Sequence, residues 1–187
     1  MKTKLIYGLI AISLFACKED DENEPVTPII PNEVEVITTV KYTLTPVTGG
    51  TAKVFQFKDL DGDGGNAPVI TTDSIDANVT YSGAIEFLNE LETPADSITN
   101  EVLEEGDEHQ VFFQKTAGDY IISYADVDKN GNPLGLSTTF ESRTMGGFLT
   151  VILRHEPDKS AAGVSGGDIT NAGGETDIEV VFPINVR

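Results

Sequence analysis

The sequence of 187 residues contains no tryptophan, a single cysteine and two histidines. Because a disulfide joins two cysteines, the chain forms no internal disulfide, and one thiolate is too few for a thiolate zinc site. The fold therefore has to be stabilised by an ordinary apolar core. The lack of tryptophan also removes the usual platform for stacking against sugars, which weakens carbohydrate binding and glycoside cleavage as functions.

Basic residues are scarce. The chain has 12 Lys and Arg against 31 Asp and Glu, which gives a formal net charge of -19. Cleavage after Ala16 would remove Lys2 and Lys4 and leave 10 basic residues against 31 acidic ones, a net charge of -21. Such a surface repels phosphate groups and anionic lipid headgroups. We therefore exclude nucleic acid as a partner.

Common catalytic motifs are also missing. The sequence has no HExxH motif, no phosphate-binding loop and no GxSxG elbow between a strand and a helix. Carboxylates are plentiful, so a glycosidase-type acid pair stays open. We predict that the protein is not an enzyme, with a hydrolase that lacks a recognised motif as the alternative.

The N-terminus has the layout of a signal peptide, residues 1–16. Lys2 and Lys4 precede the apolar run Leu5–Phe15, and small residues stand before Cys17. The run of about eleven residues is well short of the roughly 20 that a helix needs to span a bilayer.

The four residues Leu14–Cys17 resemble the lipobox of bacterial lipoproteins. The resemblance implies that the Cys17 thiol receives diacylglycerol and that the cleaved chain carries fatty acids such as palmitate at this residue. Several acyl chains, each CH₂ contributing about 0.8 kcal/mol, would hold the protein stably at a membrane. The alternative is an ordinary signal peptide followed by an incidental cysteine.

Residues 17–32 form a tether in this interpretation. The acidic run Lys18–Pro25 and the proline-rich stretch Val26–Pro31 cannot form a core. A lysine followed by acidic residues after the cysteine is similar to the surface-export signal of Bacteroidetes lipoproteins. The resemblance implies an outer-membrane lipoprotein at the cell surface, and the alternative is a plain spacer with the protein on the periplasmic leaflet.

Residues 33–187 are predicted to form an all-β domain, an antiparallel two-sheet sandwich of Greek-key, Ig-like type, with a small β-barrel as the alternative. Alternating apolar residues predict strands in eight segments: Val34–Leu44, Ala52–Phe57, Val79–Leu88, Gln110–Gln114, Tyr120–Ala125, Ser137–Ser142, Phe148–Arg154 and Thr176–Val186. One short helix is predicted to begin at Thr93–Asp96, bury Ile98 and Val102, and end at Gly106. The Gly-rich segment Ser160–Gly174 is predicted to be a long mobile loop.

Several stretches after Glu33 resemble a recurrent set of uncharacterised lipoproteins from flavobacteria: FKDLDGDGGNAPVI, YSGAIEFLNE, DEHQVFF, YADVDKNGNPLG and LTVILRHEP. Proteins of that set often carry the label of a type 1 periplasmic binding fold. This sequence is too short and too rich in strands for a two-lobed α/β solute receptor, so we do not infer solute binding. The resemblance implies a surface location and leaves the activity open.

Two Asp-rich segments match the start of a calcium-binding loop, in which alternate oxygens converge on the ion. The candidate ligands are Asp59, Asp61 and Asp63 in the first segment, and Asp126, Asp128 and Asn130 in the second. The acid expected at the twelfth position is replaced by Ile70 and Ser137. Asp, Asn and Gly also form plain turns between strands, so turns remain the competing interpretation. No cofactor is certain, and calcium is the candidate.

The two histidines each stand beside carboxylates near a predicted strand end: Glu108 and His109, and His155 and Glu156. If the two strands are neighbours, these four residues could form a zinc or copper site. Isolated exposed or hydrogen-bonded histidines are the competing interpretation.

These observations together predict a non-enzymatic outer-membrane lipoprotein that acts as a binding or accessory module. The predicted partners are the membrane, through the lipid anchor, and an outer-membrane transporter or another surface protein. A calcium-binding or transition-metal-binding accessory lipoprotein is the alternative.

Overall fold

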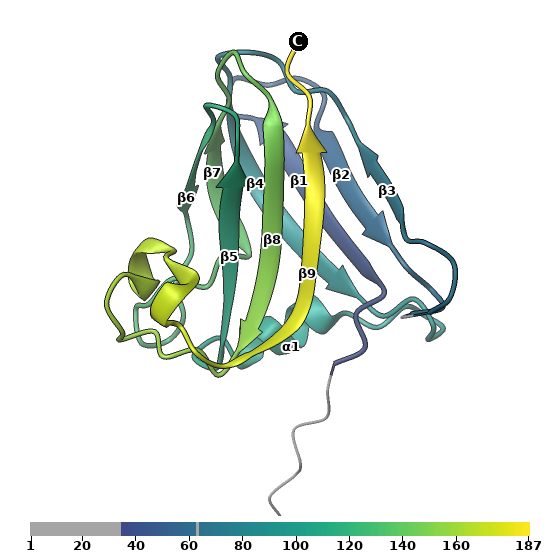
Figure 1. Cartoon of the computed structure of the whole chain (residues 1–187), viewed down its shortest axis with the longest axis vertical. Helices are drawn as coiled ribbons and strands as arrows, with labels where there is room; N and C mark the ends of the chain where they lie inside the picture. Colours follow the sequence, from purple (N-terminus) through teal and green to yellow (C-terminus); the bar gives the residue numbers. More distant parts are fainter. Residues whose placement is uncertain (1–34, 63) are drawn as a thin grey trace, which may run out of the picture. The chain divides into compact units, whose positions relative to one another are not determined.

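Two antiparallel sheets pack face to face in the computed structural model, which describes residues 35–62 and 64–187 (Figure 1). The predicted signal peptide, Cys17, the tether and Asp63 lie outside the described residues. The larger sheet has the strand order β3-β2-β1-β4-β7-β6 and the smaller one β5-β8-β9. The larger sheet consists of β1 (Thr39–Pro46), β2 (Lys53–Lys58), β3 (Val69–Thr72), β4 (Thr80–Leu88), β6 (Ile121–Tyr124) and β7 (Ser137–Glu141). The smaller sheet consists of β5 (His109–Thr116), β8 (Gly147–His155) and β9 (Glu175–Ile184). In the described part of the chain the sheets do not close into a barrel, so the predicted sandwich is confirmed.

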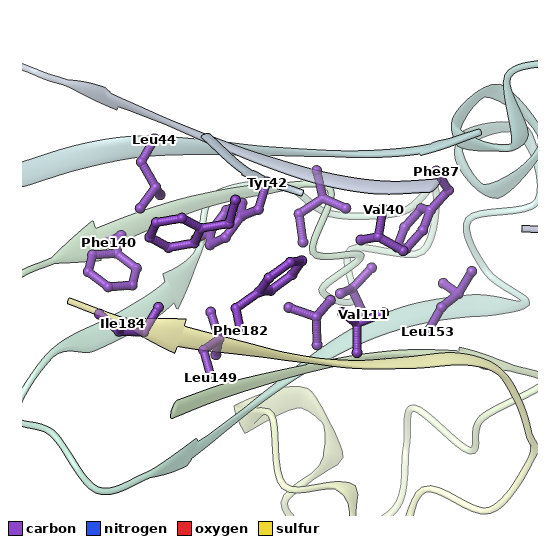
Figure 2. Close-up of a cluster of buried hydrophobic side chains, with 14 of the residues drawn as sticks. Val40, Tyr42, Leu44, Phe87, Val111, Phe140, Leu149, Leu153, Phe182 and Ile184 are labelled. Carbon is purple, nitrogen blue, oxygen red and sulfur yellow. The ribbon is translucent and has the colours of Figure 1, made fainter. Parts of the chain in front are cut away.

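The core follows from the alternation along each strand. In β1, Val40, Tyr42 and Leu44 are fully buried, while the residues between them are at least partly exposed. These side chains point toward buried residues of the smaller sheet, including Phe182 of β9 and Leu149 of β8 (Figure 2). Burial of such side chains contributes roughly 1.5–3 kcal/mol each. The sandwich is therefore held together by the apolar interior that the lack of disulfides requires.

All eight predicted segments contain strands, but β3 was missed. This four-residue strand pairs only with β2 at the edge of the larger sheet, and its residues are mostly exposed. An exposed edge strand needs no inward apolar face, so Val69–Thr72 lack the alternation that reveals the other strands.

The helix α1 (Ile98–Glu104) buries Ile98 and Val102, as predicted. Its predicted start at Thr93–Asp96 is wrong. Asn89 and Asp96 exchange two backbone hydrogen bonds of 3.0 and 2.9 Å, so the residues between them form a tight loop after β4. Thr99 fixes the helix to β4, because its hydroxyl donates to the carbonyl of Phe87 and accepts from the amide of that residue.

The segment Ser160–Gly174, predicted to be a long mobile loop, is a long connection between β8 and β9. It contains two short 3₁₀ turns, η1 (Val164–Gly166) and η2 (Ile169–Asn171). Val164 and Ala172 are fully buried against Phe112 and Ile152, which lie on the outer face of the smaller sheet. The loop therefore covers apolar residues that would otherwise face water.

Candidate functional site

The two histidines meet at one end of the smaller sheet. His109 is the first residue of β5 and lies directly opposite His155, the last residue of β8. Their rings stack with centroids 4.7 Å apart and planes 9° from parallel. Both side chains are buried, His109 almost completely. The sequence could place each histidine beside carboxylates but could not show that the strands are neighbours.

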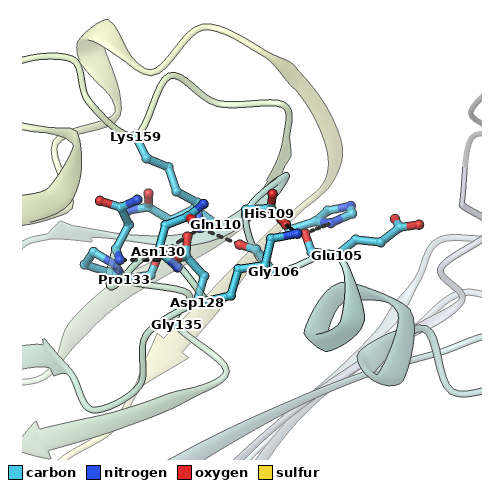
Figure 3. Close-up of polar contacts among 12 residues, drawn as sticks. Glu105, Gly106, His109, Gln110, Asp128, Asn130, Pro133, Gly135 and Lys159 are labelled. Carbon is cyan, nitrogen blue, oxygen red and sulfur yellow. Dashed lines mark hydrogen bonds and ion pairs between the residues drawn. The ribbon is translucent and has the colours of Figure 1, made fainter.

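The ring of His109 is held by groups from two other elements. Its Nδ1 lies 3.2 Å from the carbonyl oxygen of Glu105, which only accepts, so Nδ1 donates (Figure 3). Its Nε2 lies 4.0 Å from Oδ2 of Asp177, near the start of β9. Burial lowers the pKa of His109, which favours the neutral ring, and raises the pKa of Asp177.

Glu35, just before β1, adds a carboxylate to this group. Burial, followed by the nearby Glu101, raises the pKa of Glu35 to about 8. One oxygen each of Glu35 and Glu105 and one ring nitrogen of His109 lie within 4.8 Å of one another. Oε2 of Glu35 and Oδ2 of Asp177 are both buried, and neither has a hydrogen-bond partner among the residues that the structure describes.

The four residues predicted to form a zinc or copper site divide into two groups. Glu108, His155 and Glu156 offer ligand atoms within 4.8 Å of one another, whereas His109 belongs with Glu35 and Glu105. A metal ion binds an imidazole nitrogen close to the plane of the ring. Two rings stacked face to face therefore do not offer both nitrogens to one ion. Sequence reasoning missed Glu35, Glu105 and Asp177; the spacing of Glu105 four residues before His109 was the one local signal.

The second Asp-rich loop is built around an internal cation. Asp126 accepts from the amides of Gly135 and Ser137, and Oδ1 of Asp128 accepts from the amides of Asn130 and Asn132. Oδ2 of Asp128 lies 2.8 Å from Nζ of Lys159, and neither side chain is appreciably exposed.

Lys159 also donates to the carbonyl oxygens of Gly106 and Pro133, so its ammonium group has three acceptors (Figure 3). Burial alone would raise the pKa of Asp128, but the bonds from Lys159 and from the two amides lower it. The ammonium group of Lys159 thus binds a carboxylate oxygen of Asp128, which the calcium interpretation assigned as a ligand of the ion. This geometry favours the turn interpretation for the second loop.

In the first Asp-rich loop, Oδ1 of Asp59 accepts from the amides of Asp61 and Gly62, and Oδ2 of Asp61 accepts from the amide and side chain of Asn66. The bonds from Asn66 lower the pKa of Asp61. These contacts are those of a turn stabilised by Asp side chains. Calcium binding stays a prediction for this loop.

A cavity of about 540 Å³ opens between the two sheets, where the end of β2 and the segment before β1 face the start of β9. Its apolar lining includes Phe57, Leu60 and Ile178, and of these Leu60 is largely exposed. Four carboxylates also line it, and no basic residue does in the described part of the chain: Asp59, Asp61, Asp177 and Glu179. The sequence analysis did not find this cavity, because its walls come from segments far apart in the chain.

The residues Gly163–Gly167 have the GxSxG spacing, which the sequence analysis missed. Ser165 lies in the exposed turn η1, within the loop that connects β8 and β9. A nucleophile elbow needs a sharp turn from a strand into a helix. The spacing alone therefore does not make a nucleophile.

The chain matches no family model, no curated protein and no solved structure. In the residues that the structure describes, no helix is both long and apolar enough to cross a membrane.

Proposed function

We propose that the protein is a lipid-anchored, non-enzymatic binding module whose β-sandwich takes a cationic ligand with an apolar part, such as a basic segment of a partner protein. The observation that carries this proposal is the cavity between the sheets, whose lining combines apolar residues with four carboxylates and, among the described residues, includes no basic side chain. Ligand sites of roughly 300–1,000 Å³ with apolar walls and a few polar groups are typical of proteins.

The charge of the whole chain supports a cationic ligand. The net charge of -19 attracts positive partners over a distance of about 8–10 Å at physiological ionic strength. The carboxylates that line the cavity would then fix the basic group, and the apolar lining would add contact area. Steering by the surface and recognition in the cavity thus favour the same class of partner.

Acylation of Cys17 would keep this module at a membrane, and the acidic tether would let it reach partners there. In this proposal the module faces outward and its partner is an outer-membrane transporter or another surface protein. Replacing Cys17 with Ser should release the protein into the soluble fraction. Membrane retention of that variant would contradict the lipid anchor.

The experiment that tests the binding function is cross-linking and capture from intact cells. Glu179→Lys reverses one charge that lines the cavity at an exposed position of β9, and Glu104→Lys makes the same change on the exposed side of α1, away from the cavity lining. We expect the Glu179 variant to lose a partner that the wild type and the Glu104 variant retain. Equal capture by all three proteins, or an equal loss in both variants, would contradict recognition in the cavity.

A further inference from the structure

We infer that Glu35, Glu105, His109 and Asp177 form a binding site for a divalent transition-metal ion such as Zn²⁺. The site lies at the end of the smaller sheet, where the start of β5, the start of β9, the end of α1 and the segment before β1 come together. It is distinct from the cation-binding role proposed for the cavity, although Asp177 lines both.

The first argument is the orientation of His109. Histidines that bind metals through one ring nitrogen usually donate the other N–H to a backbone carbonyl or a carboxylate, which fixes the ring. His109 has this arrangement, because its Nδ1 donates to the carbonyl of Glu105 and its Nε2 faces the carboxylate of Asp177. The stack on His155 restrains the ring further.

The second argument is that buried carboxyl oxygens of Asp177 and Glu35 receive no hydrogen bond from the described residues. The side chain of Asp177 is only 9% exposed, yet its Oδ2 has no hydrogen-bond partner in the described part of the chain and lies 4.0 Å from His109 Nε2, beyond hydrogen-bond range. Among the described residues Oε2 of Glu35 also lacks a hydrogen-bond partner, but its pKa of about 8 leaves this carboxyl group protonated at neutral pH, so Glu35 would release a proton on binding a metal ion. A buried carboxylate oxygen without a donor is costly, whereas coordination of a metal ion would satisfy it.

The distances are compatible with one ion after a small contraction. Two atoms bound to the same zinc ion at roughly 2.0–2.1 Å lie about 3.4 Å apart in a tetrahedral site and about 4.2 Å apart at most. The 4.0 Å between His109 Nε2 and Asp177 Oδ2 already falls within that limit. One oxygen each of Glu35 and Glu105 and one ring nitrogen of His109 lie within 4.8 Å of one another, so these atoms would have to move closer together to bind the same ion.

The ligand atoms select the class of metal. An imidazole nitrogen with carboxylate oxygens suits zinc and its first-row neighbours, whereas calcium and magnesium prefer oxygen ligands alone. An ion also has a route to the site, because Asp177 lines the cavity that opens between the sheets.

Calorimetric titration of the full-length chain with Zn²⁺ tests this site. All proteins carry Cys17→Ser, which removes the chain's single thiol as a competing ligand. We expect one Zn²⁺ per chain, and at least a tenfold weaker affinity in Asp177→Asn and in Glu35→Gln. Glu156→Gln, which alters only the second histidine group, should bind as the parent protein does. Calcium at the same concentrations should give no binding heat at this site.

No zinc binding by the parent protein at millimolar concentration would overturn the inference. Unchanged affinity in both Asp177→Asn and Glu35→Gln would overturn it as well, and so would a loss confined to Glu156→Gln, which would place the ion at His155. Circular dichroism verifies that each variant is folded. If Asp177→Asn does not fold, the zinc affinity of Glu35→Gln alone tests the site. Glu179→Lys leaves all four ligands in place, so loss of a partner and loss of zinc are measured independently.

Discussion

The segment 105–109 contacts two polar clusters, one around Lys159 and Asp128 and the other around His109 and Asp177. The two clusters differ in whether the chain itself supplies a cation to balance the buried carboxylate. On one side, Lys159 donates to the carbonyl of Gly106 and to the carboxylate of Asp128, so the buried carboxylate of Asp128 is paired with a cation from the chain itself. On the other side, His109 donates to the carbonyl of Glu105 and faces Oδ2 of Asp177, which has no hydrogen-bond donor among the described residues. The chain supplies the cation for the first cluster, whereas the second is open to an ion from solution. A buried acidic group is therefore a candidate site only where no side chain already neutralises it.

The largest expected effect is the loss of the internal cation. Lys159→Met leaves the carboxylate of Asp128 buried and unpaired, which should reduce the free energy of unfolding by about 3–5 kcal/mol. Lys129→Met is the matched control, because the side chain of Lys129 pairs with Asp107 but is 68% exposed, so its loss should cost far less. Urea unfolding of both variants measures the difference. Equal costs would show that the Lys159 pair is not energetically distinct from a surface pair.

Lowering the pH should weaken the ion pair between Asp128 and Lys159. The pKa of Asp128 in the folded protein lies below its ordinary value of 3.8, so its contribution to stability is complete above about pH 4. That contribution is lost as the pH falls through the folded-state pKa, because the carboxylate must then bind a proton. We expect the stability gap between the wild type and Lys159→Met to narrow from pH 6 to pH 2, as followed by thermal unfolding. A gap that stays constant would mean that the ionised form of Asp128 is not what Lys159 stabilises.

Calcium distinguishes the two Asp-rich loops. Because the ammonium group of Lys159 already binds the carboxylate of Asp128, any calcium-specific stabilisation should come from the first Asp-rich loop, which contains Asp59 and Asp61. An ion at roughly 100 times its dissociation constant adds about 2.7 kcal/mol, a rise of several degrees in melting temperature. Asp61→Asn should abolish that rise, whereas Asp128→Asn should keep it; magnesium controls for ionic strength. Equal small shifts with both ions would identify both loops as turns.

The sequence was sufficient to predict what depends on local patterns. Alternation in β1 and β4 revealed the sandwich, and the spacing of Ile98 and Val102 revealed the buried face of α1. Contacts between distant segments could not be predicted. Glu35 and Asp177 are 142 positions apart in the numbering of the chain, and only the packing of the two sheets brings their carboxyl groups near His109.

The burial of Lys159 could not be predicted either, because its partners Asp128 and Gly106 come from two other loops. A lysine in a Gly-rich, Ser-rich segment is usually exposed. The loop after β8 is ordered by the apolar residues that it covers and by this buried ion pair, and both features become visible only once the smaller sheet has formed.

The smallest expected effect is no change or a small gain in stability, whereas Lys159→Met is expected to lower stability. Without metal, Asp177→Asn replaces a buried carboxylate that lacks a donor with an amide that can donate to His109 Nε2, so it should leave stability unchanged or raise it by about 1 kcal/mol. Asp128→Asn should instead destabilise the protein, because it weakens the bond to Lys159. Thermal unfolding in the presence of a chelator compares the two variants, which make the same chemical change on opposite sides of the segment 105–109. If Asp177→Asn destabilised the metal-free protein as much as Asp128→Asn, Asp177 would already have a partner that stabilises its charge. The second cluster would then resemble the first, and it would have no need of an ion from solution.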